Sequence, residues 1–545
     1  MTVATDAPPA PAVDDPAGGQ SDGQSGGQSG GQSGGQSGGQ SDGGSDGPGT
    51  GLAPVDRRTF VVAGVLFAVL MALAGRYGFH RDELYFLDCA RHLAPSYVDQ
   101  PVLTPLLARV SLWAFGVSLA GLRVWAALAG AGTVLLAGLL AREFGGGRTA
   151  QLLGAVGAAT MPALLGADHL FGPTAFDLLL WTALAFVVVR IGRTGNDRLW
   201  PVAGVALGLG LANKHSIGLF AVALVVGIVA SGGGRRLANR WFLAGALIAA
   251  AFTVPDLWWQ ATHHWPTIEM TRTLNRENGG AANIGTWVVG QLFEVTLALA
   301  WVWVVGIRVL WRSGRPLWRA LVWAYALLFL GFALTTGGKV YYLAAAYVYL
   351  LAAGAVGIEG WLDARRVRLR RLLALTALST LLSVALVLPV LPVDDVAWTY
   401  GANPELGETV GWPGLVRTVG DVWHSLPAAQ RRRAVVFTVD YGEAGAVNEL
   451  GRGAGLPVAV SGQNNEWLWG PGDPDATTVV VVAPGPLDVT GYAGTLARYC
   501  DDVRAVATLT NAASVHNQEW GGHVYLCTGL KRPWGETWPS LRQDS

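Results

Sequence analysis

Charged residues are scarce in this sequence. Asp, Glu, Lys and Arg make up 14% of the 545 residues, and hydrophobic residues make up 51%. A soluble domain carries about 25% charged residues. The formal net charge is zero, and the basic residues are dispersed between apolar runs, which argues against a nucleic-acid partner. The composition therefore indicates an integral membrane protein with polar attachments.

Cysteines are few as well: Cys89, Cys500 and Cys527. The last two share a C-terminal region that we place outside the cytoplasm, where a disulfide persists. Two separate buried thiols fit the sequence equally well, because spacing alone gives no geometry. Both alternatives stay open at this point.

We expect no secretory signal peptide near Met1, since no apolar core follows it within the usual ~15–30 residues. Residues 1–50 are rich in Pro, Ala and Asp and then repeat Gly-Gly-Gln-Ser. Such a segment buries too little apolar surface to offset its ordering entropy. We expect residues 1–55 to form a flexible cytoplasmic tail.

From Thr59 onward, apolar runs of about 20 residues, the length that crosses a bilayer, alternate with short polar loops. We expect a polytopic helical membrane domain over residues 56–392, with an interfacial helix at Pro101–Phe115. About eleven spans are predicted from the run lengths, near residues 59–77, 121–141, 148–166, 173–191, 199–213, 215–231, 240–259, 285–308, 317–335, 340–358 and 372–391.

Arginine placement predicts the orientation. The loops assigned to the cytoplasm hold most of the arginines, including a cluster from Arg365 to Arg371, whereas the later loops assigned outside hold few basic residues. By the positive-inside rule, the N-terminus is cytoplasmic and the C-terminus extracytoplasmic, in a cell membrane. The Gly- and Ala-rich composition suggests a bacterium.

The composition changes after Pro392. Short β-branched segments bounded by Gly, Pro and Asp predict buried strands, and a helix-like stretch at Glu443–Leu450 lies between the first two. This alternation predicts an extracytoplasmic α/β domain over residues 393–545. The expected strands are Ala434–Asp440, Pro457–Val460, Thr478–Ala483, Val503–Leu509 and Val524–Cys527.

Polar clusters gather on the face that we assign outside. An outer face offers no ATP or nucleotide sugar, so an enzyme there needs a donor that has crossed the bilayer, such as a lipid-linked phosphate. The reaction would need a carboxylate base for an acceptor hydroxyl and cations for the departing phosphate. The clusters are Asp82-Glu83, Asp99-Gln100-Pro101, Asp168-His169, Lys214-His215, the loop Asp256–Asn278, and Gly338-Lys339-Val340-Tyr341-Tyr342.

Several of these motifs resemble a known family. The stretches His80-Arg81-Asp82-Glu83-Leu84-Tyr85, Tyr97-Val98-Asp99-Gln100-Pro101 and Gly338-Lys339-Val340-Tyr341-Tyr342-Leu343 resemble membrane glycosyltransferases of the GT-C fold. The branch is that of the protein O-mannosyltransferases and the aminoarabinose transferases of lipid A. Tyr441–Ala446 and Asn465–Pro471 resemble the C-terminal domain of bacterial relatives. The resemblance implies inverting transfer from a polyprenyl-phosphate sugar to a protein, lipid or glycan acceptor at the outer membrane face.

The resemblance also implies roles for single residues. Asp82 matches the general base, with Glu83 beside it as the second catalytic acid. Asp99 matches an acid with a metal-binding or orienting role, so Mg²⁺ or Mn²⁺ is a possible cofactor.

Gln100 stands where the family often has lysine, which shifts the contact with the donor phosphate to Lys214 or Lys339. The expected substrate-binding residues are Arg81, Tyr85, Gln100, Asp168, His169, Lys214, His264, Arg272, Lys339 and Tyr342.

Other interpretations stay open. A transporter or flippase would show internal repeats and polar residues near the middle of its spans, and a non-catalytic scaffold would not require the acidic pair. Asp82-Glu83 is also a favourable start for a helix, Asp99 a common turn residue, and Lys214 long enough to reach the interface without a ligand. His263-His264 is a weak metal pair, because adjacent residues on a regular element point apart.

Overall fold

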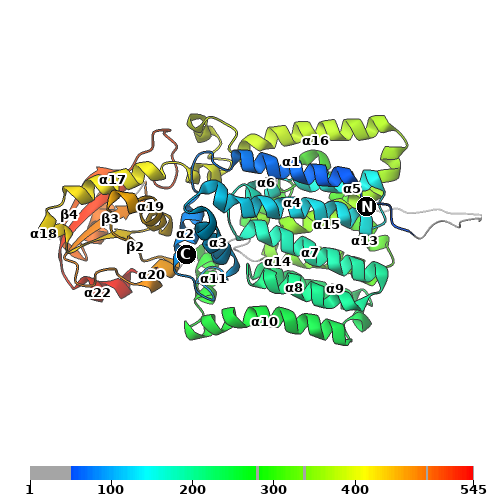
Figure 1. Ribbon diagram of the computed structural model, residues 1–545, viewed down its shortest axis with the longest axis horizontal. Helices are drawn as coiled ribbons and strands as arrows, with labels where there is room; N and C mark the ends of the chain where they lie inside the picture. Colours follow the sequence, from blue (N-terminus) through cyan, green and yellow to red (C-terminus); the bar gives the residue numbers. More distant parts are fainter. Residues whose placement is uncertain (1–50, 278–281, 335–338, 486–488, 544–545) are drawn as a thin grey trace, which may run out of the picture. The chain divides into compact units, whose positions relative to one another are not determined.

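The computed structural model describes residues 51–277, 282–334, 339–485 and 489–543. Six helical segments of this part are long and apolar enough to cross a membrane (Figure 1). They are α4 (Leu119–Glu143), α7 (Pro173–Thr194), α10 (Arg240–Thr262), α14 (Pro316–Leu334), η4 with α15 (Val340–Asp363) and α16 (Arg366–Val387).

A seventh candidate is bent. Helices α5 (Arg148–Ala159) and α6 (Pro162–Asp168) pass the same test together, with a bend of 58° between them. Pro162 is the first residue of α6. A helix tolerates proline at this position because the backbone N–H that proline lacks would have no partner within the helix. Shorter helices complete the bundle: α1 (Arg57–Leu73), α8 (Trp200–Leu211), α9 (Ser216–Ala230) and α13 (Ala300–Arg312).

Three expectations about single segments have different outcomes. The predicted interfacial helix at Pro101–Phe115 appears as α3 (Leu103–Phe115), a short apolar helix. The predicted single span at 285–308 is wrong, because α12 (Ala282–Gly290) and α13 are separate helices. The expected loop at Asp256–Asn278 is also wrong, since α10 runs to Thr262 and α11 spans Pro266–Glu277.

Polar side chains account for the break after α12. The Gln291 amide donates to the Val340 carbonyl oxygen at 2.9 Å, and the Thr296 hydroxyl donates to the Thr160 carbonyl oxygen at 2.6 Å. Buried polar groups need such partners. The chain therefore turns where these two side chains bond to neighbouring segments, although its hydropathy resembles one continuous span.

Glycines set how closely the helices cross. A Cβ on Gly306 of α13 would collide with the Leu350 carbonyl of α15, and one on Gly354 of α15 with the Val302 carbonyl of α13. Small residues at such crossings let two backbones approach, which favours packing within a membrane.

The predicted C-terminal α/β domain is present. Its five-stranded sheet has the order β2-β1-β3-β5-β4, with β2 and β3 parallel to β1 and with β5 antiparallel to β3 and β4. Strand β3 begins and ends where it was predicted. The strands are β1 (Ala434–Thr438), β2 (Val460–Ser461), β3 (Thr478–Ala483), β4 (Cys500–Thr508) and β5 (His523–Leu530).

The two faces of the sheet serve different cores. Val436 and Val480 pack with α17 (Trp412–Ser425), α19 (Tyr441–Leu450) and residues of α2 (Arg81–Arg91). Val435 and Val479 pack on the opposite face with Trp534. This division follows the alternation of side chains along a strand.

The open question about the cysteines is answered by a disulfide. Cys500 on β4 and Cys527 on β5 are bonded, with their Cα atoms 5.8 Å apart, and Cys89 is a buried free thiol.

Helix α2 connects the bundle to the sheet domain. Its first residue packs on Gly442 of α19, where a Cβ would lie 2.7 Å from the Arg81 Cβ, and a Cβ on Gly445 would lie 2.8 Å from the Leu84 carbonyl carbon. The motif Tyr441–Ala446 therefore carries glycines where α19 approaches α2. Both helices begin with a capping box, formed by His80 with Glu83 and by Asp440 with Glu443.

Candidate functional site

Glu83 is buried, and its carboxylate is paired with groups from neighbouring segments. Its carboxylate accepts two hydrogen bonds from the Arg123 guanidinium of α4, both at 2.8 Å. It also accepts from the backbone N–H groups of His80 and Phe171, each at 2.8 Å. Burial acts to raise the pKa of Glu83, but Arg123 and these donors outweigh it, so that the pKa lies below its usual range. Glu83 therefore positions α2 and is not free to take a proton.

Asp82, the neighbouring residue, has an exposed side chain, 42% accessible. Its Oδ1 accepts a hydrogen bond from the Tyr441 hydroxyl at 2.8 Å. The Arg81 Nε lies 3.7 Å from the same oxygen. Of the acidic pair predicted from the sequence, Asp82 is thus the carboxylate that a substrate can reach.

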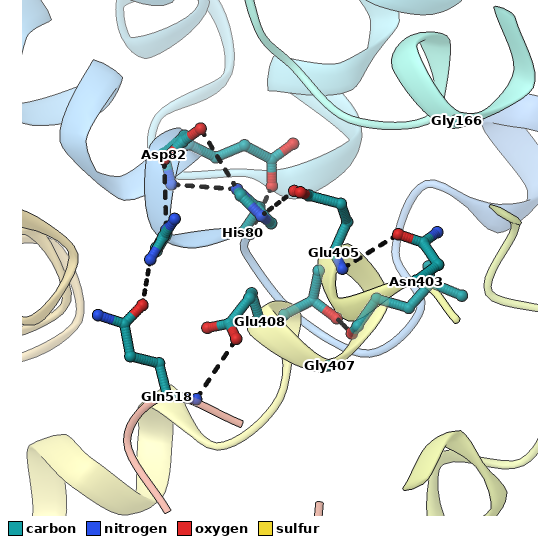
Figure 2. A network of polar contacts seen from close by, with 12 residues as sticks. His80, Asp82, Gly166, Asn403, Glu405, Gly407, Glu408 and Gln518 are labelled. Atoms are coloured by element: carbon teal, nitrogen blue, oxygen red, sulfur yellow. Dashed lines mark hydrogen bonds and ion pairs between the residues drawn. The ribbon is translucent and has the colours of Figure 1, made fainter. Parts of the chain in front are cut away.

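His80 lies between Asp82 and a residue of the C-terminal part of the chain (Figure 2). Its Nε2 is 3.1 Å from Glu405 Oε2, and its Nδ1 faces the Asp82 backbone N–H at 3.2 Å. The adjacent His80 imidazole is the main reason that the pKa of Glu405 falls to about 2, and the positive charge of Lys339 contributes to the same shift. The carboxylate is therefore ionised at neutral pH, and Lys339 lies within electrostatic reach of the His80–Glu405 pair.

Two lysines lie beside the same tyrosine ring. The Lys214 Nζ lies 5.1 Å from the Tyr341 ring centre and 5.0 Å from that of Tyr342, and the Lys339 Nζ lies 6.0 Å from the Tyr341 ring centre. Lysine occurs only three times in the sequence, the third being Lys531. The ring faces attract both ammonium groups. Two like charges beside one ring suit an anion such as a phosphate.

The second motif of the first loop lies next to the acidic pair. Asp99 accepts a hydrogen bond from Tyr85 at 2.8 Å, and burial raises the pKa of Asp99 to about 6. Gln100 is 3% exposed, and neither atom of its amide has a hydrogen-bond partner in the described part of the chain. A buried amide in this condition calls for a ligand or water.

The metal expectation is not supported by the arrangement of side chains. Among the residues that the structure describes, no three His, Cys, Asp or Glu side chains lie where they would hold one ion together. The side-chain hydrogen bond that Asp99 accepts comes from Tyr85. The donor set does not fit Mg²⁺ or Mn²⁺, which prefer several oxygen ligands.

Other predicted residues lie on different elements from Asp82. Asp168 is buried against α4, where a Cβ on Gly130 would collide with its carboxylate. His169 is also buried, with Nδ1 3.0 Å from the Gly166 carbonyl oxygen. His264 and Arg272 have exposed side chains, in the turn after α10 and on α11.

Sequence reasoning missed several residues that hold the site. Arg123 lies near the start of an expected span, where a single charge in an apolar run is itself a signal of function or pairing. Tyr441 lies in a motif that was noted only as a family feature. Glu405 and Gln518 gave no signal, because their roles depend on contacts with a segment more than 300 residues earlier in the chain.

Comparisons with known proteins agree with this architecture. Residues 99–259 match the family model described as dolichyl-phosphate-mannose-protein mannosyltransferase. No curated protein sequence matches significantly. The chain thus has the GT-C fold expected from its motifs, as a multi-pass membrane protein.

The structural relative that carries this conclusion is ArnT from Cupriavidus metallidurans. Its crystal structure in the apo state has a TM-score of 0.58 at 14% sequence identity, over 86% of this chain and 97% of that one. Its crystal structure bound to undecaprenyl phosphate has a TM-score of 0.56 at 15% identity, with the same coverage.

Replacing Glu83 by Gln is expected to destabilise the protein by about 3–5 kcal/mol, because Arg123 would remain buried without its counter-charge. Thermal unfolding in detergent measures the effect. The matched control is Asp82→Asn, whose exposed side chain has no such role. Unfolding of the Glu83→Gln variant at the wild-type temperature would show that this ion pair is not a structural requirement.

Replacing Asp99 by Asn is expected to change how stability depends on pH. The pKa of Asp99 is about 6 in the folded protein against 3.8 in a model peptide. As the pH falls through this range, the folded state binds a proton that the unfolded chain has not yet bound, so wild-type stability rises.

The Asn variant lacks this proton uptake. It should therefore be more stable than the wild type near pH 7 to 8, and this difference in stability should shrink as the pH falls towards 4. Unfolding temperatures across this pH range measure it, with exposed Asp421→Asn as control. Parallel curves for wild type and Asp99→Asn would contradict the assignment.

Proposed function

We propose that this protein is an inverting glycosyltransferase that moves a sugar from a polyprenyl-phosphate donor to an acceptor hydroxyl. The observations that carry the proposal are an accessible carboxylate, Asp82, and two lysines, Lys214 and Lys339, whose ammonium groups lie beside the Tyr341 ring. His80 contacts both Glu405 and the Asp82 backbone, and the positive charge of Lys339 helps to lower the pKa of Glu405. A base and a phosphate-binding cation within one site are the groups that this reaction needs.

The chemistry follows from these roles. Asp82 takes the proton of the acceptor hydroxyl as its oxygen attacks the anomeric carbon of the donor sugar. The bond between that carbon and the phosphate oxygen breaks on the opposite side, so the configuration inverts. Polyprenyl phosphate leaves with the bonding electrons, and Lys214 and Lys339 stabilise its negative charge.

The disulfide supports placing the site on the outer face of the cell membrane. Cys500–Cys527 belongs to the sheet domain, and disulfides persist in oxidising compartments. The basic cluster Arg365–Arg371 covers the N-cap and the first residues of α16. This end of α16 lies at the end of the bundle away from the sheet domain (Figure 1). Such clusters mark the cytoplasmic side. The ArnT relative binds undecaprenyl phosphate, which supports a lipid-linked donor here.

Transfer of radiolabelled sugar from polyprenyl phosphate in membranes tests the proposal. Asp82→Asn is expected to lower kcat by about 10²–10⁴-fold, the usual contribution of a general base, with protein level and unfolding temperature unchanged. Lys214→Ala and Lys339→Ala should each raise the KM for the donor, because each removes a charge-assisted contact to phosphate.

Lys531→Ala is the matched control, since the third lysine bonds to the Ala497 carbonyl oxygen in the sheet domain. Its kinetics should equal those of the wild type. If Asp82→Asn transfers sugar at the wild-type rate, Asp82 is not the base; if no polyprenyl-phosphate sugar is consumed by the wild type, the proposed activity is wrong.

A further inference from the structure

We propose that the C-terminal sheet domain completes the active site, with Tyr441 as a positioning residue for Asp82. The inference rests on the proposed function, in which Asp82 is the base. It assigns a task in the reaction to a domain whose fold alone implies none.

Tyr441 is fixed at both ends. Its hydroxyl donates to Asp82 Oδ1 at 2.8 Å, and its backbone N–H donates to Gln463 Oε1 at 2.9 Å. Its ring packs on that of Tyr85, 4.8 Å between centres. The phenol therefore has little freedom to move, and it holds one carboxylate oxygen in a set direction.

The remaining carboxylate oxygen is the one left for the acceptor. Asp82 Oδ2 lies 3.9 Å from His80 Nδ1, too far for a hydrogen bond. Because Tyr441 already donates to Oδ1, Oδ2 is the more available oxygen for the proton of the acceptor hydroxyl. Holding a base in a single orientation relative to the bound substrate favours the reactive geometry and so raises the rate.

The two residues before Asp82 are held in the same manner. His80 pairs with Glu405 of η6 (Pro404–Thr409), and Arg81 donates to Gln518 in the segment before β5. Three consecutive residues thus take their partners from three segments that follow α16, and Figure 2 shows the pairing of His80 with Glu405. The orientation of the base consequently depends on the docked sheet domain.

Charges around Asp82 come from several elements, but Tyr441 is a neutral donor. Its replacement by Phe removes one hydrogen bond and leaves each charge in place. The charged or titratable groups that interact with Asp82 are His80, Arg81, Asp99, Tyr341, Asp440 and Tyr441.

The test compares Tyr441→Phe with Tyr499→Phe, a matched change elsewhere in the sheet domain, in the full-length protein. Tyr441→Phe is expected to lower kcat about 10- to 100-fold, the range for a hydrogen bond to a charged group, with the donor KM unchanged. The acidic limb of its pH–rate profile should move to higher pH, because the ionised carboxylate loses a donor. Tyr499→Phe should match the wild type in both.

A double variant separates positioning from mere folding. In the Asp82→Asn background, Tyr441→Phe should cause little further loss of the residual activity, because both changes act on one carboxylate. An additive loss, or a wild-type kcat and pH profile for Tyr441→Phe, would overturn the inference while a lost activity in Asp82→Asn still supports the proposed function. Full activity of Asp82→Asn would overturn both.

Discussion

The buried ion pair between Glu83 and Arg123 is the interaction on which the site depends. Arg123 is 2% exposed and Glu83 fully buried, and such a pair is tolerated only when the remaining donors and acceptors are satisfied. Here Arg123 also donates to the carbonyl oxygens of Ala74 and Gly78, and Glu83 accepts from Phe171. One side chain pair therefore joins α1, α2, α4 and the turn before α7, and it fixes the position from which Asp82 projects.

The sheet domain acts on the same helix from the other side. Near the end of α2, Arg91 donates to Glu449 at 2.6 Å and Asn448 donates to Asp88 at 2.6 Å. Because these contacts come from α19, the helix that begins with Tyr441, the docking of the domain and the hydrogen bond to Asp82 are parts of one packing arrangement. Helix α2, which carries Asp82, thus packs between the helical bundle and the sheet domain, and both make polar contacts with it.

Much of the fold could be predicted because its signals are local. The valine run Thr478–Ala483 reads as a buried strand wherever it stands, and it forms β3. The apolar runs predict most helices for the same reason. Hydropathy failed at 285–308, where Gln291 and Thr296 end one helix by bonding to segments distant in sequence. A window of mean hydropathy cannot register such partners, and the predicted count of about eleven spans stays a prediction.

The residues of the site also differ in whether the sequence alone could predict them. The sequence predicted the acidic pair and the two lysines from residue type and motif, and the structure places Lys214 and Lys339 beside Tyr341. The sequence alone could not predict which of the two acids is buried, because burial of Glu83 depends on its pairing with Arg123, 40 residues later. The roles of Glu405 and Tyr441 required contacts between segments more than 300 residues apart.

A structure of the protein with bound polyprenyl phosphate tests the central claim most directly, since it shows where the leaving group lies relative to the base. We expect the phosphate within about 4 Å of the ammonium group of Lys214 or Lys339, the distance of an ion pair, on the side of the bundle that carries Asp82. A phosphate bound at the opposite end of the bundle, against the arginines at the start of α16, would contradict it.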